Sequence, residues 1–194
     1  MKQRRVAASA LRRLQRTLER YYGLERAPDV VRFVAPGDGE TREHLLLRET
    51  EDALEIKLVL PPIAPEFGLN DGFLQLLEGV SHFIYLVERV RTGLPATQLE
   101  LELQAEVDKF VLLAFENGSS ERDERRALHE RLYENVRYLH DANTELGERY
   151  RLANDLAARF TSRLLDAESG QARGLLQRFY RAGQGDKIRL ARAA

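Results

Sequence analysis

The spacing of apolar residues changes once along this chain, shortly after residue 60, and this change limits the folds that the chain can adopt. Residues 53–60 (ALEIKLVL) alternate apolar with charged side chains over much of their length, which is typical of a strand with one buried face. From residue 73 onward, apolar positions recur with helical spacing instead. The expected fold class is therefore mainly α (α+β), a helical protein that carries one small sheet.

Three segments are expected to form that sheet. Residues 30–35 (VVRFVA), 43–49 (EHLLLRE) and 53–60 are rich in apolar residues and are separated by PGDGE and TED, which are typical of turns. The links are too short for crossover connections. We therefore expect a three-stranded antiparallel meander within residues 29–60, with a helix covering its apolar face.

Helices are expected on both sides of this sheet. A basic helix spans residues 3–22, and Gly23 followed by Pro28 ends it. Thr97 and Glu100 have the spacing of a capping box, which marks the start of a later helix. Further helices are expected at 73–92, 98–116, 121–139, 144–167 and 171–181. Their short links favour an antiparallel helical bundle.

The whole chain, residues 1–194, is expected to fold as one domain. Its parts are a basic helix within 1–26, the meander at 29–60, the helical bundle at 73–181 and a basic tail at 182–194. Both basic segments flank an acidic middle, and we expect them to pack back onto it. In the first of them, the side chains expected to pack are Leu11, Leu14, Leu18 and Tyr22.

Composition excludes several classes of site. The chain has no cysteine, which removes disulfides, zinc ribbons, iron–sulfur centres and thiol nucleophiles. It contains no apolar run of the roughly 20 residues that cross a bilayer. Arginine greatly outnumbers lysine, as in GC-rich bacterial genomes. We therefore expect a cytoplasmic bacterial protein that contacts no membrane.

Acidic residues and a histidine gather on two neighbouring helices. Glu78 and His82 are four residues apart, as are Glu102 and Glu106, so each pair shares a helix face. If the two helices form a tight hairpin that turns near Pro95, one residue from each helix lies at the same height along the hairpin when their residue numbers add up to about 190. Glutamate and histidine on facing helices are the ligands of carboxylate-bridged metal centres. The candidate metal ligands are Glu78, His82, Glu102 and Glu106.

A structural interpretation of the same residues is the simpler one. Carboxylate-bridged centres normally use a Glu-x-x-His spacing twice, and this chain lacks that motif. Glu106 interrupts an apolar stripe, so it points partly inward and needs a partner. His82 is the most economical partner, with Lys109 as another. A structural contact between His82 and Glu106 is therefore the expectation.

Other chemistry has less support. The chain has no Gly-x-Ser-x-Gly elbow, and its glycine pairs lack the strand-to-helix setting of a phosphate-binding loop, so no organic cofactor is expected. Two hypotheses remain. The first is a non-catalytic interaction or regulatory module, whose partner is another protein or a second copy of the chain. Nucleic acid is not expected as a partner. The second is a metal-dependent enzyme or metal-binding protein using the Glu/His site.

Four segments resemble those of one family. EGVSHFIYL (78–86), QLELELQAEVDKF (98–110), RYRLANDLAARF (149–160) and RFYRAGQGDKI (178–188) occur in this order in a family of uncharacterised bacterial proteins. The resemblance extends over most of the chain. It implies a cytoplasmic bacterial protein and, because no activity is established for that family, it transfers no functional residue to this chain.

Overall fold

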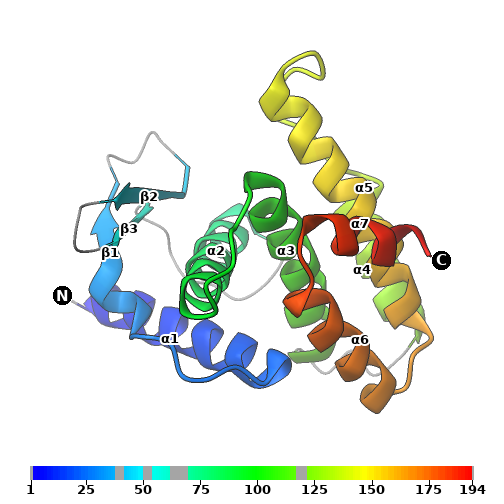
Figure 1. Ribbon diagram of the computed structural model, residues 1–194, viewed down its shortest axis with the longest axis horizontal. Coiled ribbons are helices and arrows are strands. Elements are labelled where there is room, and N and C mark those ends of the chain that lie inside the picture. Colours follow the sequence, from blue (N-terminus) through cyan, green and yellow to red (C-terminus); the bar gives the residue numbers. More distant parts are fainter. Residues whose placement is uncertain (1, 38–41, 50–53, 62–69, 117–121, 194) are drawn as a thin grey trace.

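The computed structural model describes residues 2–37, 42–49, 54–61, 70–116 and 122–193. In these ranges the chain is mainly helical, with one small three-stranded sheet, as the change in apolar spacing predicts. None of the helices described is long and apolar enough to cross a membrane. Figure 1 shows the sheet at one side of α2, and the C-terminal helices on the far side of α3.

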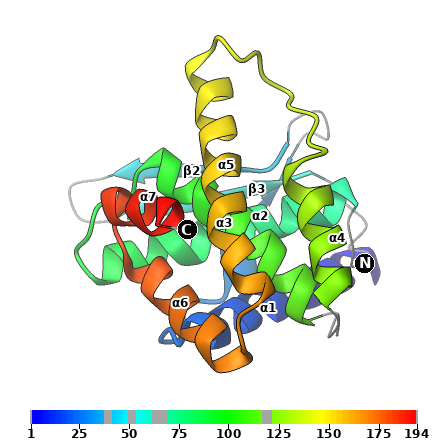
Figure 2. The same cartoon turned by 90° about the vertical axis from the view of Figure 1, so that its right-hand side faces the viewer.

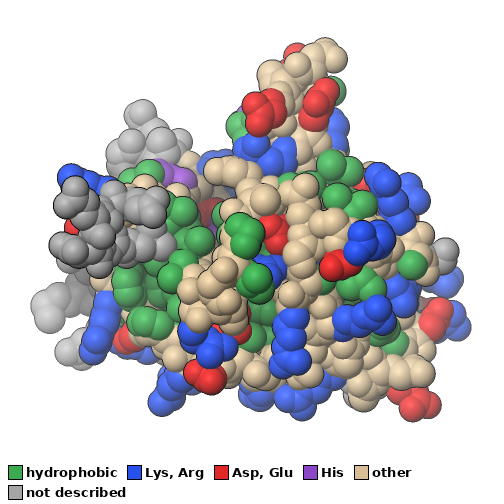
Figure 3. All heavy atoms as spheres, in the orientation of Figure 1, with side chains coloured by type: hydrophobic (Ala, Val, Ile, Leu, Met, Phe, Trp, Pro, Cys, Tyr) green, Lys and Arg blue, Asp and Glu red, His purple; other side chains and the backbone are tan. Residues whose placement is uncertain are grey.

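The basic helix α1 (Lys2–Tyr22) packs against the rest of the molecule through one face. The four side chains predicted to pack are all buried: Leu11, Leu14, Leu18 and Tyr22. Gly23 has a φ of 63°, the left-handed conformation that ends a helix, as predicted. Exposed arginines of α1 and of α6 (Ser169–Arg181) lie along the lower edge of the face shown in Figure 3.

The sheet is mixed, so the prediction of an antiparallel meander is wrong. Strand β3 (Leu54–Leu60) lies in the centre, antiparallel to β2 (His44–Glu49) and parallel to β1 (Val34–Pro36). Residues 30–33, predicted as strand, form a 3-10 turn instead. Leu58, Val59 and Leu60 are consecutive and all buried, so this part of β3 is covered on both faces. A strand that is buried in this way is stabilised most at the centre of a sheet.

Two helices form the hairpin that carries the candidate residues. Helix α2 (Asp71–Arg91) begins after Asn70, whose side chain accepts a hydrogen bond from the Phe73 backbone. Helix α3 (Gln98–Val111) begins with the predicted capping box of Thr97 and Glu100, and continues as a π-helical turn through Leu112–Glu116. Ser81 of α2 donates to Asp108 of α3 over 2.6 Å. These two residues therefore lie at the same height along the hairpin, as predicted.

The remaining helices surround α3. Helix α5 (Glu145–Leu165) packs along α3, while α4 (Arg122–Tyr133) and α7 (Gln184–Arg192) both contact α5 (Figure 2). Helix α4 ends at Tyr133, earlier than the predicted residue 139, and an irregular connection of residues 134–144 follows. Part of the predicted basic tail is helical, as α7. Because neighbours pack on several sides of α3, its polar side chains are buried along with its apolar ones.

Candidate functional site

A cluster of ionisable side chains lies where α2, α3 and the residues before β2 meet. Glu43 directly precedes β2, and its backbone amide donates to the Gln75 side chain of α2 over 3.1 Å. His82 is buried, and its Nδ1 lies 3.3 Å from the Glu43 carboxylate. Its other nitrogen, Nε2, lies 3.9 Å from the carboxylate of Glu102 on α3. The histidine therefore lies between carboxylates from two different parts of the chain.

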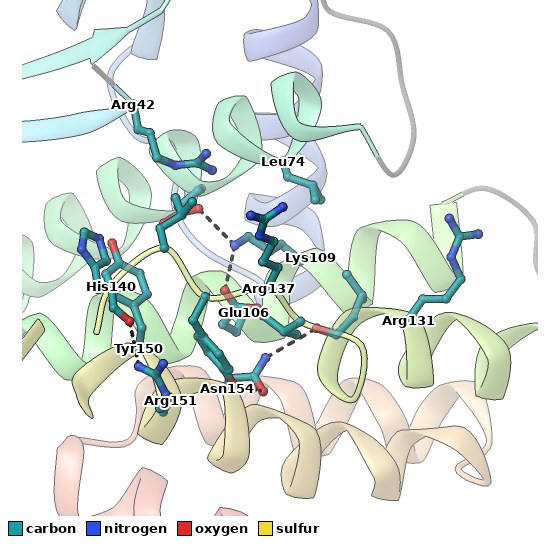
Figure 4. A pocket seen from close by; sticks show the side chains of 15 residues that line it. Arg42, Leu74, Glu106, Lys109, Arg131, Arg137, His140, Tyr150, Arg151 and Asn154 are labelled. Carbon is teal, nitrogen blue, oxygen red and sulfur yellow. Dashed lines mark hydrogen bonds and ion pairs between the residues drawn. The ribbon is translucent and has the colours of Figure 1, made fainter. Parts of the chain in front are cut away.

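Lys109 forms the second part of this cluster. Its ammonium group lies 3.0 Å from Glu78 and 2.7 Å from Glu106, and the side chain is almost completely buried. Figure 4 shows these two interactions as dashed lines that meet at the lysine nitrogen. Glu106 therefore pairs with Lys109, so the predicted contact between His82 and Glu106 is wrong, while the alternative partner Lys109 is correct.

Burial and charge shift the pKa values of these groups. Burial by itself would lower the pKa of His82, but the hydrogen bond and charge of Glu43, with the charge of Glu102, raise it to about 9. Burial raises the pKa of Glu102 to about 7, although the charge of His82 opposes this shift. For Glu78, burial acts to raise the pKa, but the charges of Lys109 and His82 hold it below its ordinary value.

The cluster contains more acids than bases. Four carboxyl side chains surround two basic groups, His82 and Lys109, in a largely buried environment. The acids are Glu43, Glu78, Glu102 and Glu106. Burying a surplus of carboxylates costs free energy unless a proton or a cation compensates their charge. The pKa of Glu102 is raised mainly by burial, and the charges of Glu78 and Glu43 add to the shift.

Two polar atoms of the cluster lack a hydrogen bond. Within the described ranges, His82 Nε2 and one carboxylate oxygen of Glu43 (Oε2) are buried and have no hydrogen-bond partner. One atom each from Glu43, Glu78 and His82 forms a set in which all the atoms lie within 4.8 Å of one another. The structure therefore brings Glu78 and His82 together, as predicted, with Glu102 beside the histidine and with Glu43 as an additional member.

Glu43 was not predicted from the sequence. It belongs to no motif and lies far from Glu78 along the chain. Only the pairing of β2 with β3, which sets His44 beside Val59, brings Glu43 over α2. Its approach also requires Gly79: a Cβ atom there would lie 2.9 Å from Glu43 Oε2 and 2.8 Å from a methyl group of Leu58.

This close approach gives a prediction for Gly79→Ala. The added methyl group overlaps buried neighbours, and such overpacking costs about 1 to 3 kcal/mol. This cost exceeds the stabilisation that alanine usually brings through its higher helix propensity. We expect a net loss of about 1 kcal/mol or more in the free energy of unfolding, measured by urea denaturation. Gly174→Ala is the matched control, because no atom lies within 4 Å of a Cβ at that helical position. The control should be neutral or more stable than wild type, and equal effects in both variants would contradict the close approach.

A cavity of about 350 Å³ opens beside the cluster and is lined in part by Glu78, Glu106 and Lys109. Its remaining walls come from α4, the 134–144 connection, α5 and Arg42 (Figure 4). The volume is within the range of small-molecule sites. The ionisable cluster therefore borders a space that is large enough for a ligand.

In comparisons with protein-family models, curated proteins and solved structures, nothing matches this chain. The resemblance to a bacterial family stays a prediction. The chemistry of the site must therefore be inferred from its own geometry.

Proposed function

We propose that this protein binds a divalent metal ion through Glu43, Glu78 and His82. The observation that carries the proposal is a buried Glu43 oxygen without a hydrogen bond, Oε2, beside a group of Glu43, Glu78 and His82 ligand atoms that all lie within 4.8 Å of one another. A buried polar atom normally has a partner, and its absence points to an ion or a water molecule. The proposal selects the second of the two hypotheses that the sequence leaves open.

The spacing of the cluster suits a single ion. Metal ions bind nitrogen and oxygen ligands at roughly 2.0 to 2.2 Å, so two ligands of one ion are at most about 4.4 Å apart. The three side chains have ligand atoms within 4.8 Å of one another, so small side-chain movements would bring them to one centre. Glu102, on the other side of the imidazole, is close enough to His82 to act as a further ligand or to orient the ring.

The donor set selects among metals. Two carboxylates and an imidazole suit Mn²⁺, Fe²⁺ or Zn²⁺, whereas Ca²⁺ and Mg²⁺ prefer oxygen ligands alone. His82 would bind the ion as the neutral imidazole, so a divalent ion would replace the histidine proton and compensate two of the carboxylates, while Lys109 would keep Glu78 and Glu106 in place. We therefore expect Zn²⁺ and Mn²⁺ to bind more tightly than Ca²⁺.

The test is a calorimetric titration of EDTA-treated protein with Zn²⁺ and with Mn²⁺. Thermal unfolding with and without each metal measures the stabilisation. We expect one ion per chain and a stabilisation of about 3 kcal/mol when the free metal is 100 times its Kd. Glu43→Gln and His82→Ala should each weaken binding by about tenfold or more. Glu130→Gln, an exposed acid on α4, is the control and should bind as wild type does.

Two outcomes would contradict the proposal. One is the lack of any stoichiometric binding, and the other is equal binding by wild type, Glu43→Gln and His82→Ala. Either would favour the alternative hypothesis, a non-catalytic interaction module in which the cluster is structural.

A further inference from the structure

Arginines dominate the cavity beside the cluster. Four of them line it: Arg42, Arg131, Arg137 and Arg151. Only two carboxylates line the same cavity, Glu78 and Glu106, and Lys109 pairs with both. The positive charge of the arginines is therefore not balanced by acids of the cavity wall, and it attracts an anion.

Two of these arginines have no partner among the residues that the structure describes. Arg42 pairs with Asp71 over 2.9 Å, and Arg151 donates to the His140 and Gly147 carbonyls over 3.1 and 3.0 Å. Arg131 and Arg137 form no hydrogen bond or ion pair with the rest of the described chain. In Figure 4, the guanidinium groups of Arg42 and Arg137 point toward the space around the Lys109 ammonium group. Positive charge from three separate segments therefore gathers at one end of the cavity.

Other parts of the cavity lining are aromatic and apolar. The rings of His140 and Tyr150 stack with their centroids 5.5 Å apart, and the lining also includes Leu74, Leu132 and Val136. Flat rings and aliphatic side chains favour a ligand that has an apolar or aromatic part beside its anionic group.

The wall formed by residues 134–144 is held in place. Tyr138 donates to Asn154 of α5 over 3.0 Å, and the Arg151 guanidinium lies 4.4 Å from the centre of the Tyr138 ring. The connection passes so close to the start of α5 that a Cβ at Gly147 would lie 1.8 Å from the Asp141 carbonyl oxygen. These contacts preform the cavity, which lowers the entropy cost of binding.

We infer that this cavity binds a small phosphate ester with an aromatic or apolar group, with Arg137 as the principal anion contact and Arg42 as a second. A phosphate ester carries a charge of about −1.5 to −2 and offers three acceptor oxygens, so it can use several guanidinium groups at once. A carboxylate carries one charge and fewer acceptors. The inference goes beyond the proposed metal site. The two sites adjoin, because Arg42 precedes Glu43 and Glu78 lines the cavity, but Arg137 belongs to neither the metal ligands nor their chain neighbours, so anion binding can be tested without metal.

The experiment is calorimetric titration of the full chain in EDTA with phenyl phosphate, inorganic phosphate and benzoate. We expect phenyl phosphate to saturate one site, and inorganic phosphate and benzoate to bind about tenfold more weakly or worse, since each lacks one of the two recognised parts. Arg137→Gln should weaken phenyl phosphate binding by about tenfold, the effect of losing a charge-assisted hydrogen bond. Arg126→Gln, an exposed arginine of α4 outside the cavity, is the matched control and should bind as wild type does.

Three results would overturn the inference: no saturable binding of phenyl phosphate up to about 10 mM, equal affinities for Arg137→Gln and Arg126→Gln, or benzoate binding as tightly as phenyl phosphate. Circular dichroism of each variant checks folding, which the exposed and unpaired Arg137 side chain should not affect. Because the titration excludes metal, it is independent of the Zn²⁺ and Mn²⁺ measurements. Phenyl phosphate binding without metal binding would contradict the proposed function alone.

Discussion

Replacing Lys109 with methionine is expected to lower the free energy of unfolding by about 3 to 5 kcal/mol in EDTA. The ammonium group lies within 3.0 Å of Glu78 and Glu106, and the side chains of these two acids are only 11% and 16% exposed. Removing one member of a buried ion pair leaves its partner charged and uncompensated, which is far more costly than the pair itself. Urea denaturation of wild type and variant measures the loss.

Two further variants make this prediction specific. Lys57→Met replaces an exposed lysine on β3 and should change the free energy of unfolding by less than about 0.5 kcal/mol. Adding Glu78→Gln and Glu106→Gln to Lys109→Met should recover much of the lost stability, because the unpaired charges are then removed. A Lys109→Met variant as stable as Lys57→Met would show that the three side chains do not interact in solution.

The second large effect is expected from Asp108 as the pH changes. Its carboxylate is buried in a separate polar network, where it accepts hydrogen bonds from Tyr22, Ser81 and Gln104. Burial raises its pKa to about 6, even though these hydrogen bonds and the charge of Lys187 oppose the shift. Its ordinary value is 3.8, so the folded protein takes up this proton at higher pH than the unfolded chain does.

The sign of the pH effect follows from this order of protonation. The ionised form of Asp108 lowers stability above pH 6, and this loss disappears as the pH falls through about 6 toward 3.8. The difference between the two pKa values corresponds to about 3 kcal/mol. Wild type should therefore gain up to this amount relative to Asp108→Asn as the pH falls from 7 to 4. A difference between the two proteins that stays constant with pH, or that changes with the opposite sign, would refute the prediction.

The helical hairpin was well predicted because its signals are local. The capping box at Thr97 fixes where α3 starts, and the short link fixes which residues of α2 and α3 lie at the same height. The Ser81–Asp108 hydrogen bond confirms this alignment. The rotation of α3 about its axis was harder to predict. An amphipathic pattern assumes one buried face, whereas α2, α5 and α7 all pack against α3. Glu102 and Asp108 are therefore more deeply buried than Glu106.

The sheet order and Glu43 could not be predicted for a different reason. Both depend on which strands pair, and short strands with mixed patterns specify pairing weakly. The consecutive apolar residues at the end of β3 were the available signal for a central strand. Once β3 separates β1 from β2, the residues before β2 lie over α2, and Glu43 reaches His82.

The polar network around Asp108 has a consequence for the rate at which this protein folds. Tyr22 of α1 bonds to Gln104 and Asp108, and Lys187 of α7 donates to Gln104, so these contacts each join residues more than eighty positions apart. Contacts between distant residues slow folding, because the loops between them must close first. During synthesis on the ribosome, α3 would emerge well before α7 and wait with Gln104 and Asp108 only partly enclosed. Until Lys187 arrives, the polar network lacks the side chain that donates to Gln104, so its burial is completed only after α7 has been synthesised.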